Sequence, residues 1–122
     1  QQRSKVRFFE RPIAEIPHGT FVLGHAGALQ AEQALDLARR YPNVYLELSC
    51  QSLTSLRRIL DLGPRDRLVM GSDWPMYHQA IPLAKLLILT EGDEALRRQV
   101  LYGNAARLLG LPSAEGTVTG FN

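Results

Sequence analysis

Two polar side chains stand directly after short apolar runs, where they could carry chemistry. His25 follows Phe-Val-Leu-Gly, and the small residues Ala26 and Gly27 leave room beside its imidazole for a ligand or a water molecule. Asp73 lies in Gly-Ser-Asp-Trp-Pro after another apolar run, where a carboxylate could hold a divalent cation or accept a proton. Simpler roles stay open: His25 could bond a loop carbonyl, and Asp73 could cap a helix near Pro75.

Four weaker candidates accompany them. Glu47 is expected to have a structural role, because a buried carboxylate must be paired. Trp74 and His78 could line a substrate pocket, although a core-packed indole and an exposed histidine are the commoner outcomes. His18 precedes a glycine in a turn and is expected to have no chemical role.

The elements that must position these residues alternate between strand and helix. Apolar runs predict strands at residues 20–24, 44–48 and 67–71. Helical spacing follows the first two, over 31–41 and from 53 to about 60, where Gly63 and Pro64 end the second helix. This pattern predicts an α/β fold with a parallel sheet. Further helices are expected at 82–89, at 94–101 and, capped by Asn104, at 105–109, and a loop from residue 113 onward.

Alternation along the strands predicts which side chains share a face. The three sets are Phe21, Leu23 and His25; Tyr45, Glu47 and Ser49; and Val69, Gly71 and Asp73. Their polar members lie at the carboxyl ends of the strands, and in α/β folds active sites are built at that edge.

Composition limits what the chain can be. Its 122 residues are 45% hydrophobic and 21% charged, which is typical of a globular protein with one core. A complete eight-stranded α/β barrel needs about 250 residues, so a barrel pattern here must be partial. The net charge of +2 comes from basic and acidic residues that are spread along the chain, which argues against nucleic acid as a partner.

Several other classes are disfavoured. The single cysteine, Cys50, excludes an intrachain disulfide framework and favours a cytoplasmic location. No apolar run approaches the roughly 20 residues that span a bilayer, so no membrane partner is expected. Nucleotide-binding glycine loops, a G-x-S-x-G elbow and a CxxC pair are absent from the sequence. The start at a residue other than methionine suggests that upstream sequence is missing.

Four motifs resemble a known family. FVLGHAG, YPNVYLELS, DRLVMGSDWP and YGNAARLLGL occur in the order found in the last third of the amidohydrolase-related family, which includes aminocarboxymuconate-semialdehyde decarboxylase and 2-pyrone-4,6-dicarboxylate lactonase relatives. The resemblance implies strands six to eight, with their helices, of a (β/α)8 TIM barrel. The whole chain would be one partial barrel domain, with a lead-in at 1–19, three βα units and closing helices at 20–111, and a tail at 112–122.

The resemblance also implies a metal site. In the family, a His-x-His pair on the first strand, a histidine on the fifth and an aspartate on the eighth hold a divalent metal, usually zinc; only the aspartate has a match here, Asp73. His25 matches a sixth-strand histidine that hydrogen-bonds the metal's water and stabilises developing charge. The implied activity is hydrolysis, or non-oxidative decarboxylation, of a small carboxylate, lactone or amide. Because most ligands would lie outside this chain, it should be inactive alone and associate with the missing barrel part or with itself.

Two other interpretations remain open. The chain could be a non-catalytic, truncated α/β module whose exposed sheet edges are covered by self-association. It could also be a small independent α/β domain that binds a ligand at its strand ends without catalysis.

Overall fold

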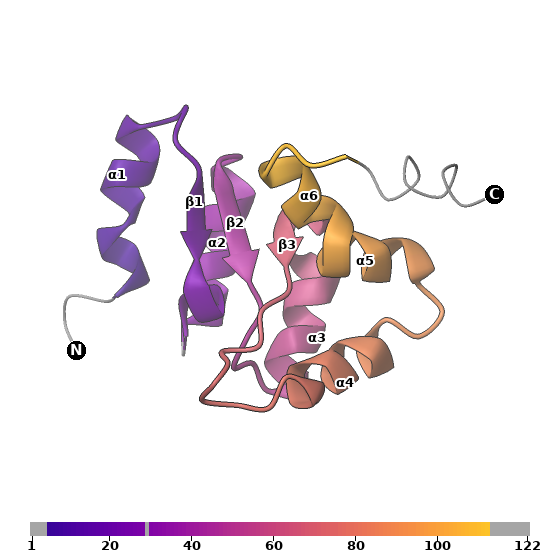
Figure 1. Cartoon of the computed structure of the whole chain (residues 1–122). Coiled ribbons are helices and arrows are strands. Elements are labelled where there is room, and N and C mark those ends of the chain that lie inside the picture. The colour runs from indigo at the N-terminus through magenta and orange to yellow at the C-terminus, as the bar shows by residue number, and fades with distance from the viewer. Residues whose placement is uncertain (1–4, 29, 113–122) are drawn as a thin grey trace.

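A computed structural model describes residues 5–28 and 30–112, so the loop expected from residue 113 lies outside the described residues. The centre of the fold is a parallel sheet of three strands in the order β1 (Phe21–Leu23), β2 (Val44–Glu47) and β3 (Leu68–Val69). The strands point the same way in Figure 1, so their carboxyl ends meet at one edge. The predicted α/β class and the parallel pairing are confirmed.

Two amphipathic helices connect the strands and cover one face of the sheet (Figure 1). They are α2 (Ala31–Arg40) and α3 (Leu53–Leu62), and the apolar positions that predicted them are the ones they bury. At the start of α3, the Ser52 hydroxyl accepts the Ser55 amide proton. At its end, the amide of Gly63 donates to the Ile59 carbonyl, as the Gly-Pro signal indicated.

The other helices flank this unit. α1 (Glu10–Glu15) lies beside β1, while α4, α5 and α6 lie beyond β3 (Figure 1). Their bounds are Ala80–Leu89, Glu94–Arg98 and Asn104–Leu108. Short 3-10 turns occupy Val6–Phe8, Gly24–Gly27 and Arg65–Arg67. Within the described residues, no helix is both long enough and apolar enough to cross a membrane.

Two strands are shorter than the apolar runs predicted. β1 ends at Leu23 because His25 and Ala26 adopt left-handed dihedrals, which no strand can continue. β3 ends at Val69 because the next amide, that of Met70, donates to the Val100 carbonyl in the C-terminal helical segment. Hydrophobicity alone could not reveal either change of backbone partner.

The cap predicted at Asn104 is wrong. α5 continues through a π-helical turn, Gln99–Gly103, directly into α6, so no helix begins afresh there. The Asn104 side chain is fully buried, and its amide donates to the carbonyls of Arg65 and Leu68 at 2.7 and 2.8 Å. Asn104 therefore joins the C-terminal helices to the start of β3.

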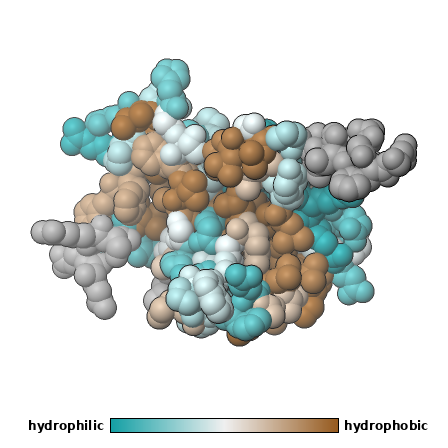
Figure 2. Space-filling model, in the orientation of Figure 1, coloured by the Kyte–Doolittle hydropathy of each residue, from teal (hydrophilic) through white to brown (hydrophobic). Residues whose placement is uncertain are grey.

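The two faces of the sheet differ in cover. Leu23, Leu46 and Leu68 lie opposite one another in register and pack into the core beneath α2 and α3. The other face carries Val22, which is 47% exposed, and the half-buried Tyr45. Figure 2 shows apolar side chains gathered over the strands on this uncovered face. One whole face of the sheet is thus available to further structure.

The buried amide of Asn104 should be a large contributor to stability. Asn104→Ala leaves the buried carbonyl of Leu68 and the carbonyl of Arg65 without their donor, and we expect it to lower the free energy of unfolding by about 2–3 kcal/mol. Urea unfolding followed by circular dichroism measures this change. The exposed Arg98→Ala, on the same helical segment, should change stability by less than about 0.5 kcal/mol. Equal effects of the two substitutions would contradict the assigned role.

Candidate metal centre

Three potential metal ligands converge where the strands end. His25, Cys50 and Asp73 follow β1, β2 and β3, respectively, and their ligand atoms all lie within 4.8 Å of one another. The His25 Nε2 atom is 3.9 Å from Asp73 Oδ1, and the Cys50 thiol donates a 3.2 Å hydrogen bond to Asp73 Oδ2. The structure therefore brings together the two residues singled out in the sequence and adds a third.

All three residues have left-handed backbone conformations. Their φ angles are 54° at His25, 59° at Cys50 and 60° at Asp73. Such φ values are uncommon for residues other than glycine, cost about 1–3 kcal/mol each, and are concentrated at functional sites. The surrounding contacts must hold these turns in place.

The left-handed turn also changes the direction of His25. Strand alternation placed it with Leu23, but Leu23 packs under the helices, whereas His25 meets Glu47 and Ser49 on the opposite side of the sheet. The predicted shared face of Phe21, Leu23 and His25 is therefore wrong for His25. Its cause is the turn at Gly24–Gly27, which redirects the imidazole after the strand has ended.

A hydrogen-bonded chain fixes the protonation of the His25 ring. The Ser49 hydroxyl donates to Glu47 Oε2 at 2.8 Å, because a carboxylate offers only acceptors. That hydroxyl has one proton, so the 2.6 Å contact between Ser49 Oγ and His25 Nδ1 requires Nδ1 to carry the hydrogen. The Nε2 atom of the ring is directed towards Asp73, and in the neutral form of the ring it offers a lone pair there.

Glu47 is paired, as its expected structural role requires. Besides Ser49 Oγ, its carboxylate accepts the backbone amides of His25 at 2.9 Å and of Ser49 at 2.7 Å. A Cβ atom at Gly71 would lie 1.9 Å from Glu47 Oε1, so only glycine leaves room for this carboxylate. The Gln51 side-chain amide also donates to the His25 carbonyl, which further fixes the turn.

The simpler roles considered for His25 and Asp73 do not describe their contacts. The His25 ring bonds a hydroxyl rather than a loop carbonyl. Asp73 caps no helix, because α4 begins only at Ala80 and the Asp73 carboxylate accepts from Cys50.

The charge around the cluster is unbalanced. Most carboxylates of the described chain pair with an arginine: Glu10, Glu15, Glu32, Asp36, Asp61, Asp66, Asp93 and Glu94. Within that same part of the chain, neither Glu47 nor Asp73 has a lysine or arginine partner; only His25 is near them. The pKa of the Cys50 thiol is raised, mainly by desolvation and secondly by the hydrogen bond to Asp73. This environment would favour a bound cation.

Trp74 and His78 lie apart from the cluster. The Trp74 side chain is 63% exposed, so the core-packed alternative is wrong for it, and its ring meets the His78 ring edge-on at 6.5 Å. His78 is exposed, and its Nδ1 accepts the amide proton of Ala80 at the start of α4. His18 is exposed in a turn, outside the cluster, as expected.

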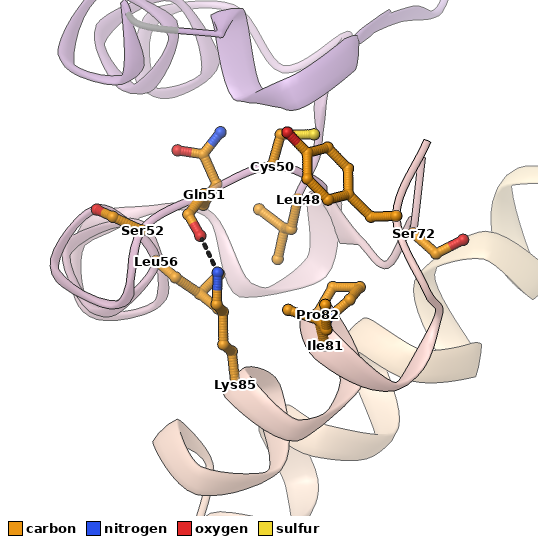
Figure 3. Close-up of a pocket in the computed structure, with 10 residues that line it drawn as sticks. Leu48, Cys50, Gln51, Ser52, Leu56, Ser72, Ile81, Pro82 and Lys85 are labelled. Carbon is orange, nitrogen blue, oxygen red and sulfur yellow. Dashed lines mark hydrogen bonds between the residues drawn. The ribbon is translucent and has the colours of Figure 1, made fainter. Parts of the chain in front are cut away.

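A pocket of about 280 Å³ adjoins the cluster at Cys50 (Figure 3). It lies between the loop after β2, the loop after β3 and helix α4. Lys85 is its basic residue, and the Lys85 ammonium group donates a hydrogen bond to the Gln51 carbonyl at 3.1 Å. The other lining residues are Leu48, Ser52, Leu56, Ser72, Tyr77, Ile81 and Pro82. Neither Trp74 nor His78 lines it.

Sequence reasoning missed Cys50, Ser49 and Gln51 as members of the site. In the sequence, Cys50 argued only against a disulfide framework and for a cytoplasmic location, yet it follows the second strand as His25 follows the first and Asp73 the third. The strand-end rule that selected His25 and Asp73 could therefore have selected Cys50 as well.

The sequence matches the Amidohydrolase family over residues 4–111. The chain belongs to this family. The match covers most of the chain and confirms the resemblance carried by the four motifs. It does not distinguish the decarboxylase-like branch from others. Among curated proteins, none matches the chain.

Solved amidohydrolase structures share the fold. An amidohydrolase from Burkholderia multivorans with bound zinc superimposes with a TM-score of 0.71 at 22% identity, over 88% of this chain and 49% of its own. A second structure of a Burkholderia multivorans amidohydrolase, with bound HEPES, superimposes with a TM-score of 0.68 at 22% identity, over 88% of this chain and 50% of that chain. For Amidohydrolase 2 from Bifidobacterium longum subsp. infantis, the TM-score is 0.63 at 18% identity, over 84% of this chain and 44% of that chain. The chain therefore spans about half the length of these structures and has the fold of part of a barrel.

Gly71 provides a test of the Glu47 contacts. In Gly71→Ala, the new methyl group displaces the Glu47 carboxylate, which then loses bonds that hold the His25 turn. We expect the free energy of unfolding to fall by about 2 kcal/mol and the NMR signal of the His25 ring to change. The matched control is Gly24→Ala, whose added Cβ meets nothing within 4 Å and should leave both quantities nearly unchanged. An unaltered His25 signal in Gly71→Ala would count against the role of Glu47.

Proposed function

We propose that this chain forms part of a metal-dependent hydrolase, with His25 and Asp73 acting at one divalent cation. Membership of the amidohydrolase family supports a hydrolase-type activity that depends on metal, and the zinc in the Burkholderia multivorans structure supports a divalent ion. The observation that carries the proposal is the convergence of the Asp73 carboxylate with the free lone pair of His25 Nε2. No observation here favours the decarboxylation that the resemblance also allowed.

The residues present fit a divalent cation. Imidazole nitrogen and carboxylate oxygen are both ligands of zinc, and the Nδ1–H of His25 is already engaged by Ser49, as the outer ring nitrogen of a metal-binding histidine usually is. When bound, the cation would supply Lewis acidity that polarises the scissile carbonyl and acidifies water. Zinc is the ion we propose.

The chain's own groups account for proton handling. Asp73 has two carboxylate oxygens, so one can contact the cation while the other accepts the proton of an attacking water and returns it to the leaving atom. In the neutral ring with its hydrogen on Nδ1, His25 would offer the cation the lone pair of Nε2. Glu47 and Ser49 fix the plane of the imidazole and keep Nε2 directed at the centre.

The pocket beside Cys50 is the proposed binding place for the part of the substrate that does not react. Its walls combine aliphatic and polar side chains, and Lys85 offers two ammonium protons besides the one given to Gln51. An acidic group on the substrate would find its partner there. The substrate class that fits is a small carboxylate-bearing lactone, ester or amide. Trp74 and His78, the other residues predicted to contact substrate, do not line this pocket and have no part in the proposed binding place.

We further propose that residues 1–122 form one unit of a barrel in which β1, β2 and β3 are strands six to eight. The support is the parallel order of the strands, their short connections through α2 and α3, and the uncovered apolar face of the sheet. Among the described residues, the edge of β1 that faces away from β2 pairs with no strand, so a further strand could pair there. The outer edge of β3 instead bonds the side chain of Asn104 and the carbonyl of Val100. The remaining five strands would come from additional polypeptide.

Association should be visible directly. Native mass spectrometry of the protein is expected to show the 13.6 kDa chain in a larger species rather than alone, because an uncovered apolar sheet face is unstable in water. Val22→Lys, on that face, should raise the fraction of free chain, whereas an exposed site away from the sheet, Glu91→Lys, should not. A chain that stays monomeric at micromolar concentration would contradict the partial-barrel proposal.

Hydrolysis should depend on both the metal and Asp73. The assembled protein with zinc is expected to release acid from a panel of lactones, esters and amides, followed with a pH indicator, and a chelator should abolish the release. Asp73→Asn removes the proton acceptor and should lower kcat/KM by about 100-fold or more. The control Glu91→Gln, exposed and remote, should keep full activity. Full activity in the chelator, or in Asp73→Asn, would overturn the proposal.

A further inference from the structure

We infer that Cys50 is a third protein ligand of the cation, alongside His25 and Asp73. The inference rests on the proposed function, because it concerns the same site. It goes further in one respect: with Cys50 included, three ligands lie within this chain. The family resemblance assigned the chain only one.

The distances suit a shared cation. In a tetrahedral zinc site with bonds of about 2.0–2.3 Å, neighbouring ligand atoms are separated by roughly 3.3–3.8 Å. Cys50 Sγ and Asp73 Oδ2 are already 3.2 Å apart, and His25 Nε2 and Asp73 Oδ1 are 3.9 Å apart. Since all three ligand atoms fall within 4.8 Å of one another, side-chain adjustments of about an ångström would complete the arrangement.

The chemistry of the donors selects the ion. Thiolate and imidazole together favour zinc and other borderline or soft ions over magnesium and calcium, which take oxygen ligands. Thiolate sulfur, imidazole nitrogen and carboxylate oxygen are all ligands that zinc takes in proteins. Binding breaks the Cys50 S–H bond and forms a sulfur–metal bond, while the proton now shared with Asp73 leaves to solvent.

Charge and position support the same assignment. The carboxylates of Glu47 and Asp73 have no lysine or arginine partner among the described residues, so a divalent cation would neutralise charge that the fold leaves unbalanced. Cys50 also lines the pocket beside the cluster (Figure 3). A cation held by Cys50 would therefore stand at the mouth of the place where the substrate is proposed to bind.

Cobalt provides a direct reading of the ligand, independent of activity. The full chain is titrated with Co²⁺ and with Zn²⁺, and binding is followed by absorption and by calorimetry. We expect one ion per chain and an intense near-ultraviolet sulfur-to-cobalt charge-transfer band, which only a thiolate ligand gives. Because Cys50 is the one cysteine of the sequence, the band has a single possible source.

Matched variants separate the possibilities. Cys50→Ser should abolish the band and weaken zinc binding by more than about 100-fold, a larger loss than removal of an outer-sphere partner gives. His18→Gln, which removes an exposed histidine outside the cluster, should bind like the unaltered chain. Circular dichroism shows whether each variant is folded.

The outcomes distinguish this inference from the proposed function. Stoichiometric metal without the charge-transfer band, bound equally by Cys50→Ser, would overturn the role of Cys50 and leave His25 and Asp73 as the metal site. Failure of the folded, unaltered chain to bind either ion would overturn the three-ligand site, whereas the proposed function is tested by the loss of hydrolysis in the chelator and in Asp73→Asn. Binding with the band, lost in Cys50→Ser, supports both.

Discussion

The Glu47 carboxylate is the constraint on which the rest of the site depends. It accepts two backbone amides and a hydroxyl from the segments that follow β1 and β2, and thereby holds two strand ends in one arrangement. It occupies the space that a side chain at residue 71 would need, so the segment after β3 can approach only because it carries Gly71. One carboxylate thus determines how all three loops meet.

The same interactions explain how uncommon backbone conformations persist. A left-handed residue other than glycine is unfavourable by itself, and here His25, Cys50 and Asp73 all adopt one. Bonds from Glu47 and Gln51 hold the first of these turns, and the thiol of Cys50 bonds the carboxylate of Asp73 across the other two. The result is that three side chains from different loops point at a common centre instead of along their strands.

Much of the fold follows from periodicity, whereas the details of the site do not. The spacing of apolar residues predicts α2 and α3 closely, and the polar residues at strand ends identify His25 and Asp73. The predicted direction of the His25 side chain was wrong, because nothing in the sequence Gly-His-Ala-Gly indicates a positive φ at the histidine. The predicted helix cap at Asn104 was wrong because a capping asparagine and a buried asparagine look alike in sequence. Only the fold shows which carbonyls lie near its side-chain amide.

Each of the three donors belongs to a different βα loop, and the loop after β3 meets the other two through the contacts of Asp73 with the Cys50 thiol and the His25 imidazole. An ion bound there would cross-link them, and its binding free energy would add to the stability of the folded chain by mass action. Thermal stability would then rise with the concentration of free metal. Without the ion, the three loops that carry the ligands would lose this cross-link and become the least stable part of the fold. In such a protein, the supply of metal controls how long the fold survives as well as how fast it works.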